Sequence, residues 1–159
     1  FEQIMRMKQD RLGSVFKALK EAAQEVNREV KFGVPLRFSG YENILDTLPA
    51  YSRTVQSFRR GEPDYFWTAI PHREGGELSY KKGMESVARA SKIIATAVES
   101  RDKTIVVLSL MNTAGRLLAS TEIEEATEMA RSGGISTIVY RVKKDLAIPA
   151  HITKKLFTQ

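Results

Sequence analysis

Two acidic residues and a lysine between positions 64 and 81 have the types and spacing that could carry chemistry. Asp64 follows Pro63 at the start of an aromatic stretch, Glu77 follows a glycine pair, and Lys81 comes four residues after Glu77. Carboxylates from two adjacent strands can hold Mg²⁺, and a lysine beside them can stabilise charge that develops at a phosphate. Asp64, Glu77 and Lys81 are therefore candidate catalytic residues of a metal-dependent phosphodiesterase.

This arrangement loosely resembles the PD-(D/E)xK nuclease family over residues 63–92. The resemblance implies a nuclease, and Mg²⁺ is the one cofactor expected under that hypothesis. The sequence departs from the family pattern because Ser79 stands where the lysine is expected, so Lys81, or Lys92 from the next helix, would have to replace it. The alternative interpretation is a charged hairpin tip that faces water, and we favour it. Whether the chain is an enzyme stays open.

Other catalytic and metal chemistry has little support in the sequence. The two histidines, His72 and His151, are far apart in the chain, and there is no cysteine. No nucleophile elbow, phosphate loop, dinucleotide fingerprint or zinc spacing is present, so no metal site is predicted outside the nuclease hypothesis. The lack of cysteine argues against a small secreted scaffold, and we expect an intracellular protein, cytoplasmic or nuclear. The longest apolar run, residues 104–111, is too short to span a membrane.

Charge points to an acidic partner. The chain carries a net charge of +6 and a pI of about 9.6, which favours nucleic acid. Cations bind phosphates and aromatic rings stack on unpaired bases, so a basic, aromatic surface suits RNA or a single strand. The predicted nucleic-acid-binding residues are Arg53, Arg59, Arg60, Trp67, Arg73, Tyr80, Lys81, Lys82, Arg141, Lys143, Lys144, Lys154 and Lys155. The first hypothesis is thus a nucleic-acid-binding domain of a larger assembly.

A long amphipathic helix over residues 2–30 supports a second hypothesis. Its apolar residues recur at the spacing of one helical face. This helix could dock into another protein subunit or self-associate, in which case the positive charge would serve only solubility. The expected stripe consists of Leu12, Val15, Phe16, Leu19, Ala23, Val26 and Val30.

Further along the chain, the pattern predicts helices alternating with hairpins. Residues 64–70 and 77–81 are expected to form one hairpin, and 104–111 and 116–120 another. Helices are predicted over 84–101, over 121–132 with a Thr121–Glu124 capping box, and from Pro149 to Phe157, with a last strand over 135–142. The expected fold is a single α+β domain over residues 1–159, cut from a larger protein. It has a mixed, mostly antiparallel sheet of about five strands, covered by about four helices.

Overall fold

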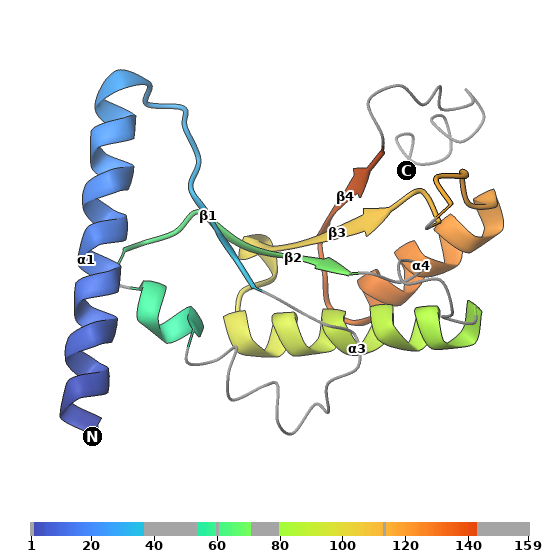
Figure 1. The fold of residues 1–159 in the computed structure, drawn as a ribbon, viewed down its shortest axis with the longest axis horizontal. Helices are drawn as coiled ribbons and strands as arrows, with labels where there is room; N and C mark the ends of the chain where they lie inside the picture. Colours follow the sequence, from blue (N-terminus) through green and yellow to red (C-terminus); the bar gives the residue numbers. More distant parts are fainter. Residues whose placement is uncertain (1, 37–53, 60, 71–79, 113, 143–159) are drawn as a thin grey trace.

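A computed structural model describes residues 2–36, 54–59, 61–70, 80–112 and 114–142. Within these ranges the chain forms a four-stranded sheet and four helices, one of which is a short helix over 54–59. The labelled elements are α1 (Glu2–Val26), β1 (Gly33–Pro35), β2 (Tyr65–Ile70), α3 (Tyr80–Val98), the 3₁₀ turn η1 (Arg101–Lys103), β3 (Thr104–Ser109), α4 (Ser120–Ser132) and β4 (Thr137–Arg141). Figure 1 shows their arrangement.

The sheet is parallel throughout, in the order β1-β2-β3-β4, so the expectation of a mostly antiparallel sheet of about five strands was wrong. Both predicted hairpins fail for the same reason. After β2 the helix α3, and after β3 the helix α4, returns the chain to the other end of the sheet, as parallel pairing requires. Tyr80 and Lys81, expected in a return strand, begin α3. Among the described residues after β3, a single antiparallel bridge, Met111 to Leu117, stands in place of the second hairpin.

The core lies between the sheet and the two helices that connect its strands. Alternate residues of the strands, among them Phe66, Val106 and Leu108, pack against α3 and α4 and are almost completely buried. The predicted stripe of α3 is confirmed at Val87 and Ile94, both fully buried. Figure 1 shows α3 and α4 together on one side of the sheet. Because β3 lies between β2 and β4, its predicted central position is also confirmed.

The side of the sheet away from α3 and α4 is less buried. The strand residues that alternate with the core positions point there. Trp67 and Val107 are half-buried, and Val139 is 45% exposed. Parallel sheets normally have both faces covered. Among the described residues, helices pack against one face only.

Helix α4 begins one residue earlier than predicted and without the expected capping box. Its N-cap is Ala119, which has no side chain able to accept a hydrogen bond from the first turn. Thr121 and Glu124 therefore lie inside the helix. Glu122, in the first turn, is buried and still lies at the positive end of the helix dipole.

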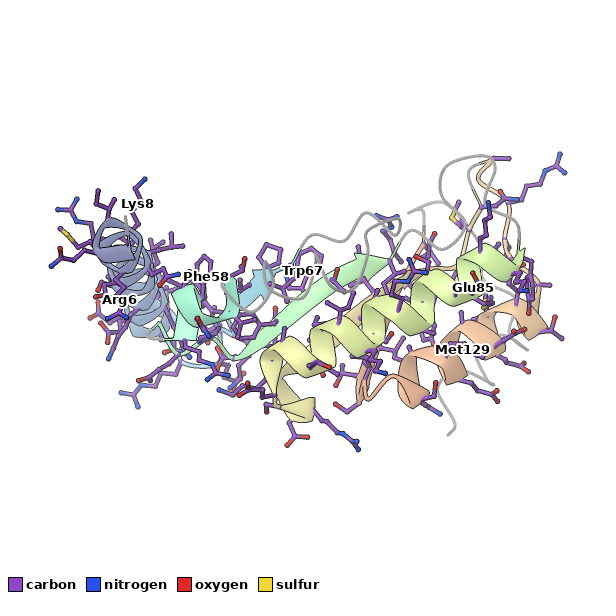
Figure 2. The ribbon with its side chains drawn as sticks, turned by 90° about the horizontal axis from the view of Figure 1, so that it is seen from below. Arg6, Lys8, Phe58, Trp67, Glu85 and Met129 are labelled. Carbon is purple, nitrogen blue, oxygen red and sulfur yellow. The ribbon has the colours of Figure 1, made fainter. Side chains whose placement is uncertain are left out.

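Helix α1 is attached at the amino ends of the strands rather than over a sheet face (Figure 1). Phe16 makes edge-to-face contacts with Phe32 and Phe58, whose ring centroids lie 5.8 and 5.4 Å away. Gly61 must be glycine, since an added Cβ would lie 2.7 Å from the Phe16 ring and 2.9 Å from the carbonyl oxygen of Gly13. Figure 2 shows Phe58 between α1 and the rest of the domain.

Candidate functional site

Asp64, the first candidate catalytic acid, connects three parts of the structure. Its Oδ2 accepts a hydrogen bond of 2.8 Å from the Phe32 amide, and its own amide donates one of 2.9 Å to the Phe32 carbonyl. Its Oδ1 accepts a bond of 3.2 Å from Nζ of Lys20 in α1, and this Nζ also donates to the carbonyl of Glu62. Asp64 therefore fastens β1 to β2, and both of them to α1.

The same contacts govern the charge of this carboxyl. Burial raises the pKa of Asp64. The Phe32 amide bond lowers it, as do the hydrogen bond and charge of Lys20 and the charge of Lys31, and together they hold the pKa below its ordinary value of 3.8. Hydrogen bonds and a cation that favour the ionised form are the general reason for such a shift. Asp64 is thus a carboxylate whose oxygens are already engaged by protein donors.

The other parts of the nuclease pattern are not brought to Asp64. Glu77 lies outside the described residues. Lys81 is in the first turn of α3, after the carboxyl end of β2, whereas Asp64 precedes its amino end. In the described ranges no three His, Asp or Glu side chains are grouped to hold a metal ion. The nuclease hypothesis stays a prediction. It was based on a hairpin that would bring the three residues together, but Lys81 lies in α3 instead of in a return strand.

Arg59 lies at the amino ends of the strands, at the other end of the sheet from Lys81 and Arg141. Its guanidinium pairs with Glu99 at 2.8 Å, and both side chains are largely exposed. The pair borders an open cavity of about 400 Å³. Because two cations and two acids line this cavity, its charge is balanced and favours no anion. The lining residues are Arg59, Glu62, Pro63, Phe66, Val98, Glu99, Ser100 and Lys103.

Four of the predicted contacts lie at the opposite, carboxyl edge of the sheet. Tyr80, Lys81 and Lys82 form the exposed first turn of α3, which contains no acid. Arg141 ends β4 and is also exposed. Arg116, which the sequence analysis missed, lies exposed in the loop that follows β3. We call the lysines and arginines among them the carboxyl-edge cations: Lys81, Lys82, Arg116 and Arg141. The arrangement suits an anion because the α3 dipole adds positive potential at the same place.

Trp67 does not belong to this cluster. It is half-buried on the less covered face of the sheet, beside Ile105 of β3. Stacking on its ring would take place on that face rather than at the carboxyl edge. The remaining predicted contacts lie outside the described residues: Arg53, Arg60, Arg73, Lys143, Lys144, Lys154 and Lys155.

The most distinctive surface is on α1. Of the eight exposed large apolar side chains in the described ranges, six belong to this helix. The predicted single stripe was wrong, because it divides into two. Phe16 and Ala23 face the domain and are half-buried, while other members face water with Val15 58%, Leu19 59% and Val26 90% exposed.

The exposed stripe has a regular spacing, and of its members only Ala22 was absent from the predicted stripe. Its residues fall at intervals of three and four, the heptad spacing of helices that pair side by side. The stripe is separate from the docked face, since α1 meets the domain through Gly13, Phe16 and Lys20. We call the exposed stripe the α1 seam, and it comprises Leu12, Val15, Leu19, Ala22 and Val26.

Comparisons with known proteins add no functional assignment. No protein-family model, curated protein or solved structure matches this chain. None of the helices in the described ranges is long and apolar enough to cross a membrane.

Proposed function

We propose that the protein is a protein-interaction module that binds an amphipathic helix of its partner along the α1 seam. The observation that supports this most directly is the exposure of Val15, Leu19 and Val26 on a helix that is already attached by other residues. Leaving such a connected apolar surface in water is unfavourable, at roughly 25 cal/mol per Å². A contiguous apolar stripe with polar flanks is typical of an interaction site.

The way in which α1 is held favours binding. In proteins, most of the stability of a helix comes from packing of its apolar face. Here the Phe16 cluster, the Lys20–Asp64 ion pair and the close approach of Gly13 to Gly61 hold the helix in place before any partner arrives. A preorganised helix loses less conformational entropy on association.

A photoreactive amino acid tests this function. It would replace Leu19, in the seam, and in a matched control Ser14, which is also exposed on α1 but lies outside the seam. After irradiation in an extract of the cells that make the protein, we expect an adduct at position 19 that mass spectrometry maps to an amphipathic helical segment. Equal labelling from both positions would overturn the proposal.

Stability provides an independent check. If the seam is for binding, Leu19→Glu leaves the free energy of unfolding of the dilute monomer within about 0.5 kcal/mol of the original. A loss of about 2 kcal/mol or more would show that Leu19 belongs to the core and would contradict the proposal.

Nucleic-acid binding is a second candidate, supported by the carboxyl-edge cations. Lys81 and Arg116 are exposed at the edge where parallel α/β sheets usually bind ligands, and Tyr80, 40% exposed, offers a ring for stacking. The basic pI of about 9.6 supports such a role, because a positive charge favours binding to nucleic acid.

Fluorescence anisotropy with short RNA and DNA strands, at about 50 and 200 mM salt, tests this candidate. Neutralising both residues, by Lys81→Gln and Arg116→Gln, should weaken binding and reduce the salt slope by about 0.7–0.9 for each phosphate that is no longer neutralised. The matched control is Arg6→Gln with Lys17→Gln, which removes the same charge from exposed positions of α1. An equal effect of both pairs would exclude a site at the carboxyl edge.

A further inference from the structure

The α1 seam has the properties expected of a surface that pairs with itself. Leu12 and Ala22 lie at equal distances on either side of residue 17. Val15 and Leu19 lie closer to the same centre. A two-fold axis at the level of residue 17 would place each residue of one copy opposite the residue of the other copy that is equally far from this centre. Isologous interfaces of homodimers have this property.

Resting on the proposed function, we infer that the partner is a second copy of this chain, whose α1 packs antiparallel along the seam with its two-fold axis near residue 17. In this register Leu12 packs against Ala22 of the second copy, and Val15 against Leu19. In these two pairs a larger residue faces a smaller one, which fills the space between two helices evenly, and Val26 faces Lys8 of the second copy. The paired region covers residues 8–26, about 27 Å of helix.

Charge complementarity selects this orientation. Arg11 and Glu25 flank the seam on the same side, both are exposed, and neither has an ion pair within the described part of the chain. In the antiparallel register Arg11 and Glu25 of the second copy lie across the seam from each other, because flanking positions are offset slightly from the seam pairs and these two are centred on residue 18. Symmetry makes this contact twice. A parallel pair would instead bring Lys8 against Lys8 and leave Arg11 without an acid opposite. Like charges at such positions oppose pairing.

The Arg11–Glu25 contact can only form between copies. Within one chain the two residues are fourteen positions apart on α1, or about 21 Å. Exposed charges at that separation are largely screened at physiological salt. Any energetic coupling between substitutions at these two positions therefore reports the antiparallel dimer.

Sedimentation equilibrium of the full chain across the micromolar range, with three charge variants, tests the inference. We expect a monomer–dimer equilibrium that Arg11→Glu and Glu25→Arg each weaken about tenfold, because each replaces two attractive pairs with two repulsive ones. The double variant should restore dimerisation to within about threefold of the original. Leu19→Glu should weaken it at least about a hundredfold, while Ser14→Glu, with the same change of charge outside the seam, should have little effect.

Each other outcome contradicts the inference in a distinct way. Dimers without recovery in the double variant would exclude the antiparallel register. A monomer at all concentrations would exclude the second copy as partner, and a seam-dependent adduct with a different protein would then retain the proposed function. A monomer that also gives no seam-dependent adduct would overturn both.

Discussion

Replacing Asp64 by alanine should destabilise the whole amino end of the sheet. The variant loses the hydrogen bond from the Phe32 amide to the carboxylate, and a bond to a charged group contributes about 1.5–3 kcal/mol. The ion pair with Lys20 adds about 0–1 kcal/mol, since the two side chains are partly exposed, at 15% and 22%. We therefore expect a loss of about 2–3 kcal/mol.

Urea denaturation measures this loss. With a slope of roughly 1–3 kcal/mol per molar, the midpoint should fall by about 1 M. Glu128→Ala is the matched control, because it removes the same charge from an exposed position of α4, and it should change stability by less than about 0.5 kcal/mol. If both variants unfolded at the same urea concentration, Asp64 would not fasten α1 and β1 to β2.

The effect of Asp64→Ala should also depend on pH. The pKa of this carboxyl is lower in the folded chain than its ordinary value of 3.8. Its contribution is therefore fully present above that value and disappears as the pH falls through the folded pKa. The difference between the original chain and Asp64→Ala should shrink below about pH 4. A difference that grew in acid would contradict the assigned direction.

Three further substitutions test individual contacts. Gly133→Ala would place a Cβ 2.5 Å from that of Ser91, at the contact between α3 and α4, so calorimetry should show a lower Tm from overpacking of about 1–3 kcal/mol; an unchanged Tm would argue against this close contact. Tyr140→Phe removes a 2.8 Å hydrogen bond with Thr127 and should cost about 0.5–1.5 kcal/mol in urea denaturation, whereas no loss would mean that the bond contributes nothing. Arg59→Ala removes a largely exposed ion pair and should change stability by less than about 1 kcal/mol, and a larger loss would assign it a structural role.

Helix positions were the part of the fold that local sequence could predict. The apolar periodicity around Val87 and Ile94 located α3, and the glycine pair after Ser132 marked the end of α4. These signals are local, because a helix forms its hydrogen bonds and its apolar face within a few turns. The capping box failed, since Thr121 matched the pattern but the chain enters α4 one residue earlier, at Ser120.

The direction of strand pairing could not be predicted from the sequence. Glycines after β2 and the Asn112 turn after β3 favoured hairpins, yet both strands lead into helices and pair in parallel. The direction of pairing depends on contacts between residues about forty positions apart, such as Phe66 with Thr104. A local sequence pattern does not predict a contact between residues so far apart in the chain.

The candidate sites show the same division. The sequence by itself determined which residues were apolar, charged or helical, including every member of the α1 seam and the carboxylate of Asp64. Only the tertiary structure decided that Phe16 is docked while Leu19 is exposed, and that the oxygens of Asp64 bind Phe32 and Lys20. The physical reason is that burial and hydrogen bonding of a side chain depend on what the rest of the chain brings to it, and an amphipathic helix with two apolar stripes does not itself specify which one is covered.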